Sequence, residues 1–278
     1  MKVPSIRAVV DLFAGRAWCP TMAAVVMTLA VGVRPAQAEI FFYSFGSGFF
    51  DYDINAGGGN VYHRFTEGGR AVDMPHTGNF RDPYLQGGKL RLQVEPDANN
   101  RGRSEFRLIH GKTHATDAPR FGRNFNYGFD FRIDSASTLP KNTVHISQVW
   151  QRGATGVVPF TLTVRRKTKP TRLILELSTK YSDEPAKKTS LCRIYENRTY
   201  SVIVAARPSY VGYNVSGKAK VSVYEGDNRI GHTSQNPRWG IRPGVDGAEN
   251  TFDVRMGIYR PEMRTRWIMD LDNCWYSY

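Results

Sequence analysis

Two arginines flank a glutamate in the stretch Arg103-Ser-Glu-Phe-Arg107. On a β-strand, Arg103, Glu105 and Arg107 would share one face, because side chains alternate between the two faces. A carboxylate between two guanidinium groups fixes their orientation, and their remaining N–H groups can bind a carboxylate ligand in a bidentate manner. The same spacing also suits a row of charges on a solvated strand, worth under about 1 kcal/mol per pair. The stretch therefore predicts either an anion-binding fork or an ordinary charge ladder.

A second stretch, residues 251–261, places an arginine, a glycine and a tyrosine in line on one face of a predicted strand. The apolar residues at 252, 254, 256 and 258 alternate with polar residues that include Arg255, Gly257 and Tyr259. This period of two is typical of a strand with one face in a core. Gly257 removes a side chain, so a ligand could approach the backbone there. The alternative is an outer strand with a half-buried tyrosine and an arginine whose charged end reaches water.

A third stretch, residues 143–150, has an alternation that leaves two arrangements open. In a regular strand, Gln148 and Trp150 share one face and His145 lies on the other. The first face would offer an amide donor beside a stacking surface, and the second would offer an imidazole. A β-bulge would bring both to the same side. Glutamine is mostly exposed in proteins, so a glutamine in a buried strand is a candidate functional residue.

The elements that position these residues are predicted to be strands throughout. Helical periodicity is nearly absent, and short alternating runs are separated by Gly, Pro, Asn and Asp. Residues 46 to about 75 are glycine-rich and predict a loop, and residues 225–228 predict a hairpin turn. About twelve strands are too many for one open sheet, which favours two stacked, curved antiparallel sheets of the jelly-roll type. Strands are predicted at 40–45, 89–94, 103–109, 126–133, 143–150, 159–165, 172–177, 199–206, 220–224, 252–259 and 267–276.

Residues 1–38 have the pattern of a signal peptide. Basic residues lead into an apolar run of about 12 residues, which is too short to span a bilayer. The sequence Ala36-Gln-Ala38 then provides a small-x-small cleavage site. We therefore expect a signal peptide at 1–38 and a single domain at 39–278 that is secreted or periplasmic and free of the membrane after cleavage.

The mature chain is strongly basic. Residues 1–38 hold four Lys or Arg and one Asp, so the rest has 34 basic and 24 acidic residues, or +10. Polyanions are natural partners for such a chain, and among them acidic polysaccharide, nucleic acid and an anionic surface remain open. Nucleic acid is the least expected, because no strand clusters basic and aromatic residues.

Two cysteines remain after cleavage, and the metal and cofactor signals are weak. Cys192 and Cys274 form an even count in an oxidising compartment and are predicted to pair, the alternative being two buried free thiols. No acidic run has convincing metal-ligand spacing, although Asp and Asn loops could hold a structural Ca²⁺. We expect no cofactor and a monomer.

In their order along the chain, the three stretches resemble motifs of the β-jelly-roll polysaccharide lyases. Over about residues 90–278 they are similar to the R-x-E-x-R, Q-x-H and K-x-G-x-Y motifs of alginate lyases, and to glucuronan and heparin lyases of the same fold. Arg255 stands where the last motif has Lys. Trp150 stands where Q-x-H has its histidine, so His145 and His76 are the candidates for that role. The resemblance implies an all-β, concanavalin A-like β-jelly-roll sandwich of two curved antiparallel sheets.

The resemblance also implies β-elimination on a uronate polysaccharide such as glucuronan or alginate. This reaction removes the proton at C5 and expels the 4-linked sugar, and donors must stabilise the charge that develops on the uronate carboxylate. The implied catalytic residues are Tyr259 as base and acid, Gln148, Arg103 and His145. A tyrosine has an ordinary pKa near 10 and needs nearby cations to act at neutral pH. The implied substrate-binding residues are Arg107, Arg255, Glu105, Trp150 and His76.

Two other functions remain as alternatives. A lectin-like, non-catalytic carbohydrate-binding protein of the same fold would suit the departure from Q-x-H. A retaining glycoside hydrolase would need two carboxylates about 5 Å apart. The pair Asp270 and Asp272 has two carboxylates on one predicted strand face, but it lies near the end of the chain.

Overall fold

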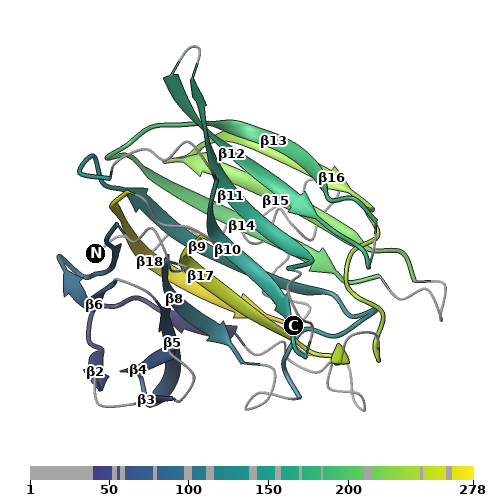
Figure 1. Ribbon diagram of the computed structural model, residues 1–278, viewed down its shortest axis with the longest axis horizontal. Coiled ribbons are helices and arrows are strands. Elements are labelled where there is room, and N and C mark those ends of the chain that lie inside the picture. Colours follow the sequence, from purple (N-terminus) through teal and green to yellow (C-terminus); the bar gives the residue numbers. More distant parts are fainter. Residues whose placement is uncertain are drawn as a thin grey trace, which may run out of the picture. The chain divides into compact units, whose positions relative to one another are not determined.

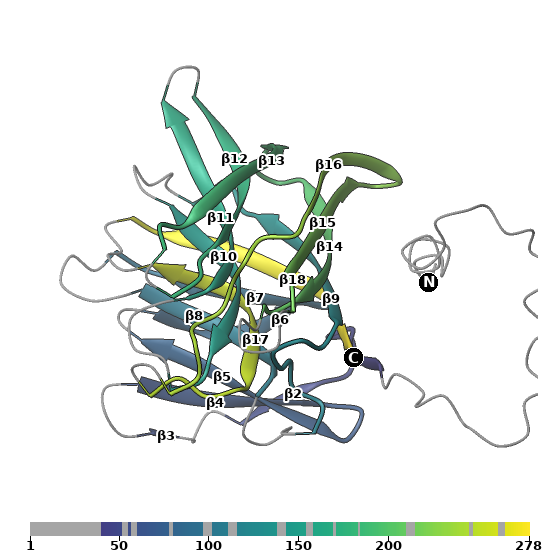
Figure 2. The same ribbon diagram turned by 90° about the vertical axis from the view of Figure 1, so that its right-hand side faces the viewer.

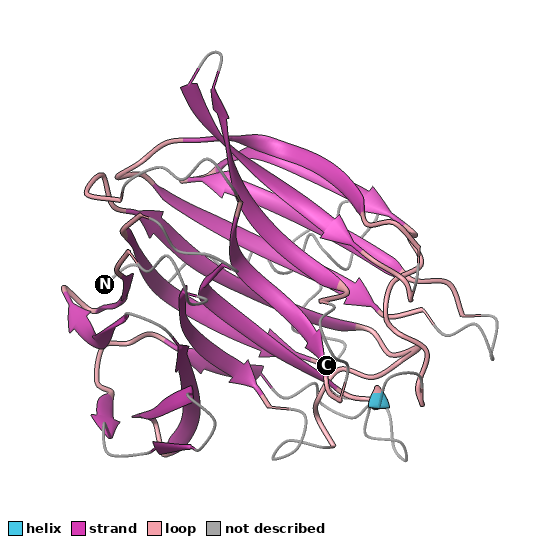
Figure 3. Cartoon of the chain, viewed as in Figure 1, coloured by secondary structure: helices cyan, strands magenta, loops and turns pink. Residues whose placement is uncertain are grey.

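The folded part of the chain consists almost entirely of β-strands (Figures 1 and 3). The computed structural model describes residues 40–278 apart from 52–54, 57–59, 78–79, 97–101, 111–115, 138–142, 154–157, 169–170, 183, 210–214, 245–246 and 261–264. The strands are β1 Ile40–Tyr43, β2 Phe49–Asp51, β3 Asn55–Ala56, β4 Asn60–Glu67, β5 Arg70–Thr77, β6 Phe80–Gln86, β7 Lys89–Val94, β8 Gly102–Ile109, β9 Phe125–Ile133, β10 Val144–Gln151, β11 Phe160–Thr168, β12 Thr171–Thr179, β13 Lys187–Ile194, β14 Thr199–Arg207, β15 Lys218–Glu225, β16 Asn228–Gln235, β17 Phe252–Arg260 and β18 Trp267–Ser277.

The strands form two antiparallel sheets. An eight-stranded sheet has the order β16-β15-β14-β9-β18-β7-β6, with β1 paired to β18. A ten-stranded sheet has the order β13-β12-β11-β10-β17-β8-β5-β4-β2, with β3 paired to β4. The view in Figure 2 shows the sheets as two layers. The predicted all-β sandwich of two antiparallel sheets is confirmed.

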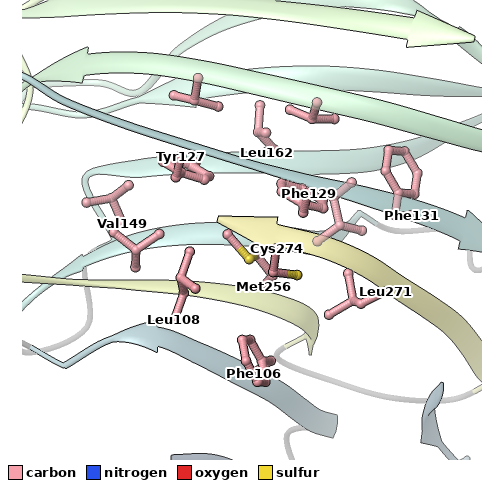
Figure 4. Close-up of a cluster of buried hydrophobic side chains, with 14 of the residues drawn as sticks. Phe106, Leu108, Tyr127, Phe129, Phe131, Val149, Leu162, Met256, Leu271 and Cys274 are labelled. Carbon is pink, nitrogen blue, oxygen red and sulfur yellow. The ribbon is translucent and has the colours of Figure 1, made fainter. Parts of the chain in front are cut away.

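Apolar side chains of the two sheets meet between the layers (Figure 4). In β17 the residues at 252, 254, 256 and 258 are fully buried, as the alternation predicts. Burying each such side chain stabilises the fold by roughly 1.5–3 kcal/mol. The labelled core residues are Phe106, Leu108, Val149, Leu162 and Met256 of the ten-stranded sheet and Tyr127, Phe129, Phe131, Leu271 and Cys274 of the eight-stranded sheet. The opposite face of the ten-stranded sheet, which points away from this core, is called the outer face below.

The prediction of a loop from residue 46 to about residue 75 is wrong. Strands β2, β3 and β4 and most of β5 lie there, and β4 and β5 form a hairpin around Gly68 and Gly69. Both glycines have positive φ values, 59° and 75°, which a tight turn requires. The segment resembles a loop in sequence because it is rich in glycine, and Phe65, Val72 and Met74 provide its buried side chains in the core.

The predicted disulfide is also wrong, because Cys192 and Cys274 are free thiols. Cys192 lies on β13 at the edge of the ten-stranded sheet, where it packs against Gly231 of β16. Cys274 lies on β18, inside the eight-stranded sheet. Burial raises the pKa of both thiols, to about 11 for Cys192. Among the described residues, no helix is long and apolar enough to cross a membrane.

Candidate active site

The site is centred on β17, which lies between β8 and β10 in the ten-stranded sheet. Tyr259 of β17 is directly opposite Arg103 of β8 on one side and His145 of β10 on the other. Directly opposite residues in antiparallel strands have Cα atoms about 4.5–5.5 Å apart. The register therefore brings together three predicted catalytic residues from strands that are far apart in the sequence.

A second row crosses the same three strands, four residues along β17. Arg255 is opposite Arg107 of β8 and Gln148 of β10. Between the two rows, Gly257 is opposite Glu105. Because residues two or four apart in a regular strand share a face, Arg103, Glu105 and Arg107 lie on the same outer face as Tyr259 and Arg255.

An irregularity in β10 places both His145 and Gln148 on this face. The register of β10 against β11 and against β17 shifts between His145 and Ser147. Ser147 turns inward instead, and its hydroxyl is 3.1 Å from the hydroxyl of Tyr127 in the other sheet. The bulge that the sequence left as an alternative is present, so the histidine and the glutamine lie on one side although they are three residues apart.

Glu105 connects the polar residues of the two rows. Its carboxylate accepts a hydrogen bond from Arg103 Nε at 2.6 Å and from Gln148 Nε2 at 2.5 Å. Arg255 Nη1 lies 3.9 Å from the same carboxylate. Glu105 is 1% exposed, so these contacts are made away from water, where charge-assisted hydrogen bonds are strong. Glu105 thus holds Arg103 and Gln148 in fixed orientations, as the sequence predicts for Arg103.

Asp253 is a member of the site that the sequence analysis did not single out. Its carboxylate accepts a hydrogen bond from Arg255 Nη2 at 2.6 Å and lies 3.6 Å from Arg107 Nε. It is two residues from Arg255 on the same strand face, so the alternation already used for Glu105 could have found it. Asp73 adds a third carboxylate, which lies 4.0 Å from Arg107 Nη1, so three carboxylates face the three arginines of the site.

Burial shapes the electrostatics of Arg255. The pKa of this guanidinium is lowered to about 10, mainly by burial and also by the charges of Arg103 and Arg107, against the opposing effect of Asp253. The guanidinium carbon lies 4.6 Å from the centre of the Trp150 ring. Trp150, two residues beyond Gln148 on β10, therefore packs its half-buried ring against Arg255.

His145 and Tyr259 are in ring contact. Their centroids are 5.6 Å apart and their planes are inclined by 61°. Burial lowers the pKa of His145 to about 4, while Glu105 acts in the opposite direction. The imidazole is therefore neutral at pH 7, and its buried Nδ1 has no hydrogen-bond partner among the described residues. A neutral imidazole beside a phenol can accept or pass on a proton.

His76, the other candidate histidine, lies on the inner face of the sheet. It is opposite Ser104, and its Nδ1 lies 3.1 Å from the Ser104 hydroxyl. Its ring stacks on Phe80 of the other sheet at 4.6 Å. His76 is fully buried, and burial lowers its pKa to about 3. Its substrate-binding role, expected from the sequence, does not fit this position, because the ten-stranded sheet lies between its ring and the outer face.

Gly257 is required by its backbone conformation, and not, as the sequence suggests, by the approach of a ligand. Its φ is +134°, a conformation that side chains rarely adopt. A Cβ there would lie 2.5 Å from the Ser104 carbonyl oxygen and 2.9 Å from Leu92 Cδ1. The missing side chain permits close packing against β8 and the core, rather than the approach of a ligand.

The carboxylates considered for a hydrolase lie elsewhere. Asp270 and Asp272 belong to β18 in the eight-stranded sheet. Asp270 is held by Arg91 Nε at 2.7 Å and by Arg132 Nη2 at 2.9 Å. Among the described residues, no group of three or more His, Cys, Asp or Glu is arranged to hold a metal ion.

Comparison with known proteins identifies the fold. No protein-family model matches the chain, and no curated protein matches it. Among solved structures, the alginate lyase AlyC3 is 11% identical, with 84% of this chain and 90% of that chain covered and a TM-score of 0.51. An alginate lyase from Klebsiella pneumoniae is 11% identical, with coverage of 72% and 84% and a TM-score of 0.49. From the two antiparallel sheets and the likeness to AlyC3, we conclude that this chain has a β-jelly-roll fold of the kind found in that alginate lyase.

Proposed function

We propose that the chain is an exported polysaccharide lyase that cleaves an acidic, uronate-containing polysaccharide such as glucuronan or alginate by β-elimination. The observation that carries the proposal is the row formed by Arg103, Tyr259 and His145 on the outer face. It combines an anion-binding cation, a phenol and a neutral imidazole on adjacent strands. The fold shared with AlyC3, whose name describes it as an alginate lyase, supports the same reaction class.

The first task of the site is to bind the uronate carboxylate. Arg103 uses Nε to bind Glu105, which leaves its two terminal nitrogens for a substrate oxygen. Gln148 uses one N–H for Glu105 and keeps the second. Donors fixed in this way stabilise the enolate-like charge that develops on the carboxylate, because they need no reorganisation during the reaction.

The second task is to move the proton. Tyr259 removes the proton from C5, and the electron pair of that bond forms the C4=C5 double bond. The bond between C4 and the glycosidic oxygen breaks, and the departing oxygen receives a proton from Tyr259. His145, neutral and in contact with the Tyr259 ring, is placed to accept the phenolic proton and return it.

The hydrolase alternative is less well supported by this geometry. Both buried carboxylates of the site, Glu105 and Asp253, are hydrogen-bonded to guanidinium groups. A hydrolase needs one carboxyl group protonated and one free to act on the sugar or on water. Neither role suits carboxylates that are ionised and already hydrogen-bonded to Arg103 and Gln148 or to Arg255.

A non-catalytic carbohydrate-binding protein is the second candidate. The observation that favours it is Trp150, which occupies the position of the histidine in the Q-x-H motif. Such a protein would keep the arginines of the outer face and bind polyuronate without cleaving it. His145 beside Tyr259 favours the enzyme, because binding alone does not require that pair.

The test is to incubate purified residues 39–278 with a panel of polyuronates and to follow the ultraviolet absorbance of unsaturated uronate products. We expect at least one polymer to be cleaved and Tyr259→Phe to reduce the rate by at least about 100-fold. Tyr195→Phe, at an exposed tyrosine, is the matched control and should keep wild-type activity. Binding of the polymers without any unsaturated product would support the non-catalytic protein and overturn the lyase.

A further inference from the structure

The outer face continues beyond the catalytic row onto β11, β12 and β13. The antiparallel register extends both rows across these strands. With strands about 4.8 Å apart, the extension adds roughly 14 Å to the site. The first row continues from His145 through Thr163, Glu176 and Ser190, and the second continues from Gln148 through Thr161, Ser178 and Lys188.

This extension differs in chemistry from the arginine-rich side of the site. Four of its six residues carry hydroxyl groups, which bind sugar hydroxyls without regard to charge. Its one carboxylate, Glu176, accepts hydrogen bonds from Arg165 Nε at 2.9 Å, from Arg165 Nη2 at 2.7 Å and from the Ser190 hydroxyl at 3.1 Å. Arg165 lowers the pKa of Glu176, so this acid is ionised and its charge is balanced by Arg165.

Lys188 is the cation of the extension that is left for a ligand. It is exposed, and no salt bridge joins it to another residue in the described part of the chain. It lies opposite Ser178 at the end of the second row. Its charge lowers the pKa of both Glu176 and His145, although β11 and β12 separate β13 from β10. The positive charge of Lys188 therefore reaches across the outer face to the row that contains His145.

We propose that Lys188 determines specificity by binding the carboxylate of a second uronate, separated along the substrate from the one held by Arg103 and Gln148. The inference rests on the proposed function, since it assigns part of the same site. It implies that the substrate carries carboxylates on more than one sugar. A chain with a single uronate at the cleavage point would leave Lys188 without a partner.

The neighbouring residue provides a matched control. Lys187 is exposed on the same strand and is opposite Thr179, so it lies on the other face of β13. Lys187→Met and Lys188→Met remove the same charge from the same strand. A difference between them therefore reports the position of the charge and not the total charge of the protein.

The experiment measures steady-state kinetics and binding together. Wild type, Lys188→Met and Lys187→Met are compared on polyuronate for kcat and KM. The same two substitutions are made in the Tyr259→Phe variant, which keeps the polymer intact, and the affinity is measured by calorimetry. A carboxyl-reduced form of the polymer, in which the uronates are neutral sugars, is the second ligand.

We expect Lys188→Met to raise KM, and to weaken binding, by about 3- to 10-fold with little change in kcat, as for one solvent-accessible charge-assisted contact. Lys187→Met should match wild type, and the difference between the two variants should vanish on the carboxyl-reduced polymer. Equal KM values for the two variants on polyuronate, with the wild type active, would overturn the role of Lys188. An inactive wild type whose polyuronate binding still depends on Lys188 would overturn the lyase but support the carboxylate contact.

Discussion

At the scale of single residues, Glu105 determines the geometry of the site. It is the shared acceptor for Arg103 and Gln148 and lies next to Arg255, all on the outer face. A buried carboxylate with three such neighbours does more than balance charge: it decides where the free N–H groups of Arg103 and Gln148 point. Without it, the donors for the uronate carboxylate would keep their chemistry and lose their orientation.

Glu105→Gln should therefore impair both catalysis and stability. Losing the fixed donors is expected to lower kcat by about 100-fold, comparable to removing one oxyanion donor. Leaving Arg255 and Arg103 partly uncompensated in a buried position is expected to reduce the free energy of unfolding by about 3 kcal/mol. Denaturant unfolding and lyase kinetics of the same preparation measure the two effects.

Glu225→Gln is the control for this substitution, because Glu225 forms an exposed ion pair with Arg198 at 2.9 Å. It should leave the unfolding midpoint and kcat close to those of wild type. A Glu105→Gln enzyme with wild-type kcat would show that the carboxylate does not organise the site.

His145 gives the site a pH dependence whose direction follows from its burial. Its pKa of about 4 means that the neutral imidazole persists from neutral pH down to about pH 5. If the neutral form passes the phenolic proton, kcat should stay constant in this interval and fall below about pH 4. A fall in kcat near pH 6.5, the ordinary pKa of a histidine, would contradict this assignment. The profile is measured between pH 3 and 8, and His145→Asn should lower kcat across it.

Residue types and spacing predicted most of this site. The alternation of β8 and β17 placed Arg103, Glu105, Arg107, Arg255 and Tyr259 on one face, because both strands are regular at these positions. Spacing could not show that His145 joins them, since a β-bulge depends on tertiary packing and not on a local pattern. It also could not show that His76 turns to the core, because that depends on which neighbouring strand pairs with β5.

At the scale of elements, β17 depends on close packing against β8 at Gly257. The backbone there has a φ of +134°, and the space that a Cβ would need is occupied by the Ser104 carbonyl oxygen and Glu105 Cα. Both obstacles are backbone atoms of β8, which cannot rotate away as a side chain would. The strand that carries Tyr259 is therefore positioned by the absence of one methyl group.

Gly257→Ala should consequently destabilise the fold by roughly 2–4 kcal/mol, from backbone strain and from displacement of β8. It should also reduce activity, because Tyr259 and Arg255 lie two residues to either side. Gly226→Ala is the comparison: Gly226 has a φ of +60° in the β15–β16 turn and no atom within 4 Å of its would-be Cβ. A loss of stability no larger than that of Gly226→Ala would refute the packing argument.

Most of the strands that the sequence missed share a physical feature, the exception being β5, which lies between β8 and β4. β2, β4, β6, β13 and β16 lie at or next to sheet edges, where polar residues are tolerated on both faces. Apolar and polar residues alternate less regularly in such strands, because a strand at the edge does not need a full row of apolar side chains to cover the core. Central strands such as β9 and β17 were predicted closely because they must bury one complete face.

At the scale of the whole folded unit, buried histidines link stability to pH. His76 lies between the sheets beside His63, whose ring centroid is 4.7 Å away, and its pKa is lowered to about 3. A lowered histidine pKa means that the folded state disfavours the proton. Stability is therefore complete above the unfolded pKa near 6.5 and is lost as the pH falls from there toward 3.

His76→Gln should flatten this dependence. Each unit of pKa difference corresponds to about 1.4 kcal/mol, so wild type should lose several kcal/mol more than the variant between pH 6.5 and pH 3. His232→Gln, at an exposed histidine of β16 whose pKa burial also lowers, should stay close to the wild-type curve because water screens its charge. Urea unfolding at a series of pH values provides the measurement, and parallel curves for wild type and His76→Gln would rule out this source of acid sensitivity.

The number of alternating runs predicted the two-sheet architecture. The cysteine count, in contrast, predicted a disulfide that the structure does not contain. The predicted disulfide assumed that two cysteines in an exported chain would meet, whereas Cys192 packs against Gly231 of β16, Cys274 lies on β18, and both are free thiols. Cysteine counts carry no information on which strands become neighbours, and that is decided by the long-range register of the sandwich.

The most direct test of the account is the chemical nature of the bond cleavage. Polyuronate is digested in water labelled with heavy oxygen, and the products are analysed by mass spectrometry. Elimination by Tyr259 predicts a new non-reducing end that is unsaturated and a cleavage that incorporates no oxygen from water. Saturated products that carry the label at the cleavage site would show hydrolysis and would contradict the proposed function.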